Sequence, residues 1–463
     1  MVWRAVCRSG GGRVVAVLVV VCACAGSLAP VAGADPWSGP LAVPGVSSVS
    51  AFGFTPGGVG VAIVGPDELL RFPADGVFGS PQATGLGSLN GVRMALFGRG
   101  RVVLGGARGT SAEIAFGSVG GKFGRPQTVA RGASQETTRV VALAANAAGK
   151  TAAVVMAGRR PNSMSADQWL VVREPGGSSF RRVVTLVKGL TWPRGDQAVT
   201  VNANGDVLAA WDDGSSVRAL IVRADGRVGR VQRLGVGAGG GSRISVALDP
   251  TRRAVVLWMA LGVGEGLDGF GPGTVHVAYA KPGKTFARAR QLDSGLPSGE
   301  RSASATPSLP VNVVLLRDRA QLAWTGYADG RYLVRAADIG ASGTVSGQQT
   351  LSPPDTDAIL LGMSAGPRGG VVVAWFNGLA GWLPSRQPQA STPGFYAAAR
   401  SATAATFGAT EPIEQVPTVT DAYTFTSPPL LATNPISGQT VLLWSLTLPA
   451  GQDALHYAIR QPT

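Results

Sequence analysis

Few residues of this 463-residue chain combine the type and the spacing that catalysis requires. Gly362, Ser364 and Gly366 fit the G-x-S-x-G pattern of a serine nucleophile, which needs a strand before it and a helix after it. Pro367 and a second apolar run follow instead, so the pattern is better explained as a turn between two strands. Residues 264–269 match the G-x-G-x-x-G dinucleotide fingerprint but also lack a neighbouring helix, which predicts a loop.

Residues that commonly bind metals are equally sparse. The only two histidines, His276 and His456, each lie six residues before a proline, so they occupy equivalent positions of a repeat and do not form a metal pair. The carboxylates of residues 212–213 and 355–357 come in twos, fewer than a calcium loop needs, and suit turns. We therefore predict no catalytic residues, no metal site and no cofactor.

The segments that must position any site are repetitive. One phrase, an aromatic residue or Val followed by small and polar residues and an apolar pair, begins at Phe78, Phe123, Phe180, Val228, Phe286, Val345 and Phe407. Ahead of it come a turn and an apolar strand that often ends in tryptophan, at Trp211, Trp258, Trp324, Trp375 and Trp444. A third strand with a tight polar turn lies between these two units, as in residues 217–227.

Each repeat therefore holds four short strands, which we name A to D, with turn residues between them. No long stretch keeps a helical apolar period, so the predicted class is all-β. Four antiparallel strands in about 50 residues are typical of a β-propeller blade. The repeated tryptophans are then expected to pack between blades and not to contact a ligand.

The two ends of the chain complement each other. The last repeat stops after its third strand, and residues 37–43 match the missing fourth-strand phrase. Pairing these segments would close the ring and remove two exposed sheet edges. This predicts eight blades. Seven is the alternative, because the first two repeats are shorter and lack the tryptophan.

With its turn glycines, strand-ending tryptophans and the F-G-x-P-Q phrase at residues 78–82 and 123–127, the chain resembles the secreted bacterial β-propeller repeat proteins. The resemblance spans nearly all of residues 37–461 and implies blades, without implying a chemistry. Sialidase-like propellers are similar at the level of the fold only, because their S-x-D-x-G-x-x-W turn is absent from every repeat.

The first 34 residues predict an export signal. Three arginines and an apolar core at residues 14–21 lead to a small-x-small cleavage pattern at residues 32–34. We expect a single propeller domain over residues 35–463 outside the cytoplasm, with a lipid anchor at Cys24 as the alternative. All three cysteines lie in the signal, and no later stretch is long enough for a transmembrane helix.

The charge balance is basic. The formal net charge is +14, and loss of the three arginines of the signal lowers it to +11. No run of Lys and Arg exceeds two residues, so we expect no nucleic-acid partner. The charge favours an anionic glycan or cell-wall polymer as partner, unless the arginines are simply spread over the surface.

The connections predict which face of the ring would bind. The A–B and C–D turns are short and repetitive, whereas the B–C and D–A connections are long and varied, and recognition residues concentrate on variable loops. We predict a site on the B–C and D–A face, near the channel, formed by Arg159, Arg160, Trp192, Arg194, Asp196, Phe270, Glu300, Arg301, Trp382 and Arg386.

These features predict an exported, non-catalytic propeller that acts as a binding scaffold for a protein or a cell-surface glycan. One alternative is a sialidase-like glycan hydrolase, which would need an arginine cluster together with acidic residues at the sugar. A second alternative is a structural protein of the cell envelope.

Overall fold

The structure is a computed structural model of the 463 residues, which divide into residues 1–36 and the compact unit Trp37–Thr463. The structure describes residues 36–65, 67–73, 76–133, 138–159, 165–191, 196–237, 243–262, 271–296, 310–378, 393–416, 424–447 and 453–462. These residues form strands and turns without a helix, which confirms the predicted all-β class. In these ranges no helix is long and apolar enough to cross a membrane.

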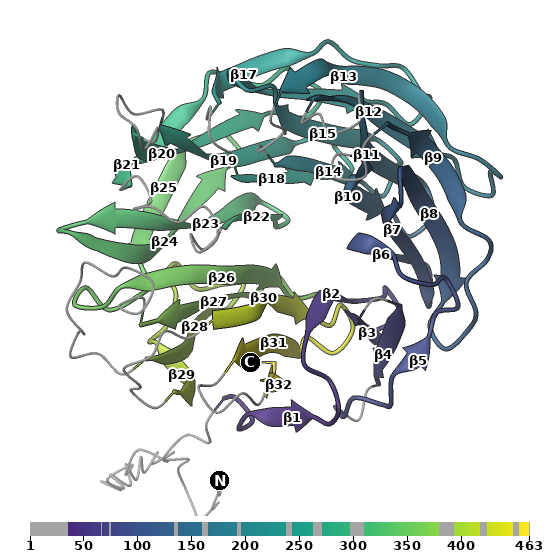
Figure 1. The fold of residues 1–463 in the computed structure, drawn as a ribbon. Coiled ribbons are helices and arrows are strands. Elements are labelled where there is room, and N and C mark those ends of the chain that lie inside the picture. The colour runs from purple at the N-terminus through teal and green to yellow at the C-terminus, as the bar shows by residue number, and fades with distance from the viewer. Residues whose placement is uncertain are drawn as a thin grey trace, which may run out of the picture. The chain divides into compact units, whose positions relative to one another are not determined.

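The strands form eight four-stranded antiparallel sheets around a ring (Figure 1). Blade 1 consists of β2 (Val49–Phe54), β3 (Gly60–Val64), β4 (Glu68–Phe72) and β5 (Gln82–Ala83). Blade 2 consists of β6 (Asn90–Phe97), β7 (Arg101–Arg108), β8 (Ser111–Ser118) and β9 (Gln127–Arg131). Blade 3 consists of β10 (Arg139–Ala145), β11 (Thr151–Gly158), β12 (Ser165–Arg173) and β13 (Arg181–Thr191). Blade 4 consists of β14 (Gln197–Val201), β15 (Val207–Asp212), β16 (Ser216–Val222) and β17 (Gln232–Val236).

The second half of the chain repeats this arrangement. Blade 5 consists of β18 (Arg243–Leu248), β19 (Ala254–Gly262), β20 (Gly271–Ala280) and β21 (Arg290–Leu296). Blade 6 consists of β22 (Val311–Leu315), β23 (Arg319–Ala328), β24 (Arg331–Gly340) and β25 (Val345–Thr350). Blade 7 consists of β26 (Ala358–Ala365), β27 (Val371–Asn377), β28 (Gly394–Arg400) and β29 (Glu411–Gln415). Blade 8 consists of β30 (Thr424–Thr433), β31 (Thr440–Thr447), β32 (Asp453–Arg460) and β1 (Leu41–Val43).

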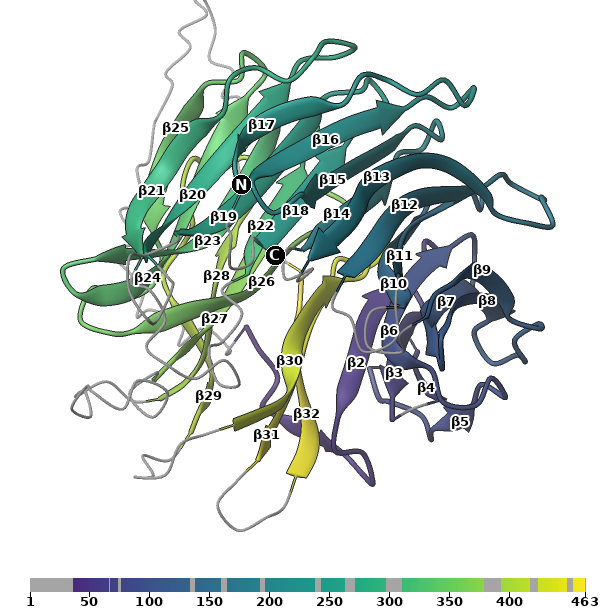
Figure 2. The ribbon, with the colours of Figure 1, turned by 45° about the horizontal axis from the view of Figure 1, so that its top comes forward.

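Blade 8 closes the ring in the predicted way. Strand β1 pairs with β32, with Leu41 opposite Tyr457, and a bridge joins Trp37 to Arg460. The indole nitrogen of Trp37 donates to the Glu411 carboxylate of blade 7 at 2.9 Å. The prediction of eight blades is therefore confirmed, and the alternative of seven is wrong. Strands β2 and β30, from opposite ends of the described chain, lie side by side in both ribbon views (Figures 1 and 2).

The tryptophans of strand B form the core between blades. Each is at most 1% exposed, and each packs in a cluster that combines two neighbouring blades: Trp211, Trp258, Trp324, Trp375 and Trp444. Burial of a side chain of this size is among the largest apolar contributions that a single residue makes to a core. The prediction that these residues pack between blades is confirmed.

Strand A of every blade is innermost and contacts strand A of the next blade, from β2 round to β30 (Figure 1). The first residues of the eight inner strands therefore meet around one mouth of the central channel. In each blade the chain reaches that mouth through the D–A connection. The topology thus gathers residues that are far apart in sequence.

The B–C connections differ from the prediction that they are long. In blades 1, 2, 4 and 6 the two strands are joined by short turns, as between Arg108 and Ser111 and between Ala328 and Arg331. The longer B–C connections belong to blades 3, 5, 7 and 8, and much of each lies outside the described residues. Variation in the length of the B–C connections is therefore a property of half of the ring.

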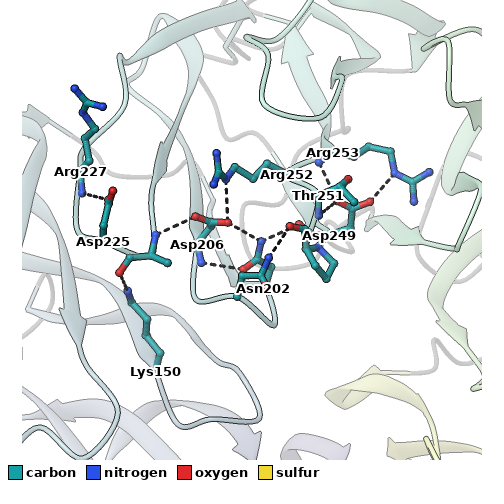
Figure 3. Close-up of polar contacts among 12 residues, drawn as sticks. Lys150, Asn202, Asp206, Asp225, Arg227, Asp249, Thr251, Arg252 and Arg253 are labelled. Carbon is teal, nitrogen blue, oxygen red and sulfur yellow. Dashed lines mark hydrogen bonds and ion pairs between the residues drawn. The ribbon is translucent and has the colours of Figure 1, made fainter.

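Polar side chains in the A–B turns join successive blades. The Asn146 amide donates to the carbonyl of Asn202 in the next blade at 2.9 Å. The Asn202 amide donates in turn to the carbonyl of Asp249 at 2.8 Å (Figure 3). Arg253 continues the series to the carbonyl of Leu316 in blade 6, and Asn434 reaches Gly58 across the closure at 2.9 Å. The repeated turn asparagines thus also hold neighbouring blades together.

Candidate arginine cluster at the channel mouth

Charged residues begin the inner strands of three consecutive blades. Arg139 pairs with Met156 in blade 3, and Arg243 pairs with Met259 in blade 5, at equivalent positions. In blade 4, Gln197 pairs with Trp211, so the residue before it, Asp196, holds the same position. The corresponding residues of blades 7 and 8 are uncharged: Ile359, opposite Phe376, and Ser427, opposite Ser445. Among these described positions, the charge therefore lies on blades 3 to 5.

Blade 2 adds a fourth member, Arg93. It lies one register position further along its inner strand than the other three residues do in their blades. Its Nε donates to the carbonyl of Val141 in blade 3 at 3.1 Å, which fixes the guanidinium beside β10. The Arg243 guanidinium lies 2.9 Å from a carboxylate oxygen of Asp196. We call Arg93, Arg139, Asp196 and Arg243 the mouth cluster. Four blades contribute to it, although its members span 150 positions of the sequence.

The mouth cluster is accessible to solvent yet surrounded by protein. Arg93 and Arg139 are exposed, and the side chains of Arg243 and Asp196 keep 41% and 38% of their exposure. Desolvation, followed by the charge of Arg93, lowers the pKa of Arg139. Desolvation also raises the pKa of Asp196, although the charges of Arg243 and Arg93 act in the opposite direction. Arg93 of blade 2 therefore lies near groups of blades 3 and 4.

Three guanidinium groups and one carboxylate leave a net positive charge at this mouth. Arginine presents a planar set of donors that matches carboxylate, phosphate and sulfate groups. Partial desolvation strengthens such contacts, because the local dielectric is lower than that of water. The mouth cluster is therefore chemically suited to bind an anionic group. The described residues of the cluster offer one carboxylate, whereas glycoside hydrolysis typically employs two.

Many other arginines have a structural partner. Arg335 binds the buried Asp293 at 2.9 Å, Arg400 binds both carboxylate oxygens of Asp338, and Arg460 binds both oxygens of Glu411. Each of these pairs joins neighbouring blades. A substantial part of the basic composition therefore serves assembly of the ring, and the mouth cluster differs from it because its cations outnumber its carboxylates.

Two of the predicted site residues lie within the described chain. Arg159 follows β11 on the B–C side and lies 3.7 Å from Asp167, and Asp196 belongs to the mouth cluster. These two residues thus belong to separate ion pairs and are not brought together by a described contact. The other eight predictions fall outside the described residues and stay predictions: Arg160, Trp192, Arg194, Phe270, Glu300, Arg301, Trp382 and Arg386.

Sequence reasoning missed Arg93, Arg139 and Arg243. They lie five to seven residues before the A–B turn of their blades, because a β-bulge follows Arg139 in β10 and Arg93 lies one register position further along β6. An alignment of the repeats on the A–B turn, extended back to the start of strand A, would have placed three arginines and Asp196 close to one column. The prediction from variable connections does not cover residues inside the strands.

The rejected motifs that lie within the described residues have ordinary structural roles, whereas residues 264–269 lie outside them. Ser364 lies inside β26, paired with Val372, and another strand follows its turn, so the serine is not at a nucleophile elbow. His276 and His456 lie opposite Trp258 and Trp444, which confirms their equivalent positions on strand C. The Asp213 carboxylate accepts hydrogen bonds from the backbone and hydroxyl groups of the serines that follow it in its own turn.

No family model matches the chain, and no curated protein matches it in sequence. Many solved structures are similar, including the Dos1 propeller, with 8% identity, a TM-score of 0.49, and coverage of 90% of this chain and 94% of that one. A protein of unknown function from Dyadobacter fermentans is 13% identical with a TM-score of 0.38, covering 80% and 94% of the two chains. The polysaccharide lyase Uly1 is 10% identical with a TM-score of 0.39, covering 91% of each. At these identities the likeness concerns the fold alone.

Proposed function

We propose that this chain is an exported, non-catalytic recognition propeller that binds an anionic group of a cell-surface glycan, a wall polymer or a protein at the channel mouth. The observation that carries the proposal is the convergence of Arg93, Arg139 and Arg243 from three blades on a mouth that holds one described carboxylate, Asp196. The ring fixes these groups before binding, so little ordering entropy is lost when a ligand arrives.

Hydrolysis of an acidic glycan is supported less well. An enzyme of that class would also use arginines to hold the substrate carboxylate, but it needs an acid and a nucleophile or base besides. Asp196, the described carboxylate of the mouth cluster, is engaged by Arg243. A purely structural role in the envelope would leave the surplus of positive charge at the mouth unexplained.

A binding screen of the chain from residue 35, run against acidic and neutral glycans at low and high salt, tests this proposal. We expect saturable binding that is selective among anionic ligands and that persists in part at high salt. Binding to every anion alike, lost completely at high salt, would show that the net charge alone is responsible. Turnover of an acidic glycan by the same preparation would favour the hydrolase instead.

A further inference from the structure

A second site is suggested by a groove between the C–D hairpins of blades 5 and 6. The groove holds about 470 Å³, and it is lined by residues of strands β20 and β24 and of the turns that follow them. It lies at the A–B and C–D side of the ring, because the turns that line it are the C–D turns of the two blades. The mouth cluster is at the opposite ends of the inner strands, so the two sites are separate.

Four cations line this groove: Lys281, Lys284, Arg288 and Arg290. All four are exposed, no acidic residue is among the lining, and their side chains make no ion pair or hydrogen bond with any residue that the structure describes. The arginines that join blades are, in contrast, paired with carboxylates. Four like charges around one hollow repel one another, so their arrangement does not stabilise the blade pair and instead creates a strongly positive surface.

The base of the groove is apolar and buried. Val277, Tyr279 and Ile339 contribute to it, and they are 3%, 6% and 1% exposed. The Tyr279 hydroxyl donates to the carbonyl of Ala341 at 3.1 Å, and its ring lies so close to Gly343 that an added Cβ there would be 2.8 Å from Cδ1. Gly343 also has a φ of 85°, so glycine is required for two reasons. The aromatic ring is therefore held in place before any ligand binds.

We propose that this groove binds an anionic segment of a polymer, with its charged groups among the four cations. Carboxylate, phosphate or sulfate groups of such a polymer accept the charge-assisted hydrogen bonds that lysine and arginine donate. The volume exceeds what a lone phosphate would fill.

Titrations with an oligogalacturonate, a glycerol-phosphate polymer and neutral dextran test the inference and distinguish carboxylated from phosphorylated sources. For at least one acidic polymer, we expect Lys284→Gln/Arg288→Gln to weaken binding about tenfold, equivalent to about 1.4 kcal/mol. The matched control Arg227→Gln/Arg230→Gln removes two charges from the C–D hairpin of blade 4 and should change affinity less than about threefold, as for exposed charges that do not contact the ligand. Equal losses in both variants, or no loss in the first, would overturn the inference.

A second measurement needs no variant. Bound polymer should protect Lys281 and Lys284 of the wild-type chain from acetylation, while Lys188, exposed on blade 3, stays reactive. Equal labelling of all three lysines at saturation would contradict binding in the groove.

A variant with Arg139→Gln separates the two sites. Loss of groove protection in that variant would refute an independent site, whereas retained protection would support it even if the channel mouth bound nothing.

Discussion

At the scale of single residues, turn asparagines have a role that their local sequence does not reveal. Asn202 is 3% exposed, and its Oδ1 accepts from the Asp206 amide at 2.8 Å within its own turn. Its Nδ2 donates to Asp206 at 3.1 Å and to the Asp249 carbonyl of the next blade at 2.8 Å. In an ordinary hairpin such a side chain would only cap its own turn. In this ring it also joins two blades (Figure 3).

Replacing Asn202 by Ala should destabilise the ring by about 1–3 kcal/mol, because it leaves buried hydrogen-bonding groups without partners. Asn204→Ala is the matched control, since the Asn204 amide donates to Pro250 at 2.8 Å from an exposed position where water can replace it. Denaturant unfolding followed by tryptophan fluorescence measures the difference. Equal midpoints for the two variants would contradict the role of Asn202.

The two histidines predict a pH dependence. His276 and His456 lie opposite strand B tryptophans, and desolvation lowers the pKa of both. The folded chain therefore binds fewer protons than the unfolded chain, so stability falls as the pH drops below the unfolded value of about 6.5. His276→Gln/His456→Gln should reduce the loss of thermal midpoint between neutral and mildly acidic pH. An unchanged loss in the double variant would assign the dependence to other groups.

At the scale of elements, blade 8 depends on a strand from the far end of the chain. Trp37 is 3% exposed, and Ser38 exchanges hydrogen bonds with Ile459 at 2.8 and 2.9 Å. Without residues 37–43, the outer edge of β32 would be unpaired, and Glu411 would lose one of its donors. Exposed strand edges promote pairing between molecules.

A chain that starts at residue 44 should therefore unfold at a lower temperature and self-associate as its concentration rises. A chain that starts at residue 35 is the control and should remain unchanged at the same concentrations. Light scattering and thermal unfolding compare the two. A shortened chain that stays monomeric with an unaltered midpoint would show that the closure contributes little.

The strands and their order could be predicted because each blade repeats local signals. Turn residues, the tryptophan that ends strand B and the phrase before strand D all act within one blade, and the prediction of closure needed only the match between residues 37–43 and that phrase. The mouth cluster could not be found in this way. It forms because Arg93, Arg139 and Arg243 lie at or near the start of inner strands of different blades, and their proximity depends on the geometry of the ring.

At the scale of the whole molecule, the ring separates structural from available charge. Inter-blade arginines are neutralised by carboxylates such as Asp293 and Glu411, whereas the mouth cluster and the groove between blades 5 and 6 carry surplus positive charge. The +11 charge expected after loss of the signal is therefore not uniformly spread. Two faces of one rigid scaffold could then contact the same anionic polymer.

The carboxylate of Asp196 should oppose binding of an anion, because it competes for Arg243. Asp196→Asn removes that competition and keeps the size of the side chain, so we expect affinity for the anionic ligand to rise severalfold. Calorimetric titration measures it. Weaker binding by this variant would mean that Asp196 contacts the ligand directly or orients Arg243 for it.

The most direct test of the central claim is a titration of the best ligand of the screen into Arg93→Gln/Arg139→Gln and into the charge-matched control Arg227→Gln/Arg230→Gln. Both variants lose two positive charges, but one pair converges at the channel mouth and the other lies on an exposed hairpin. Our account predicts a loss of affinity of at least about tenfold for the first variant and less than about threefold for the second. Equal affinities of the two variants would contradict a recognition site at the channel mouth.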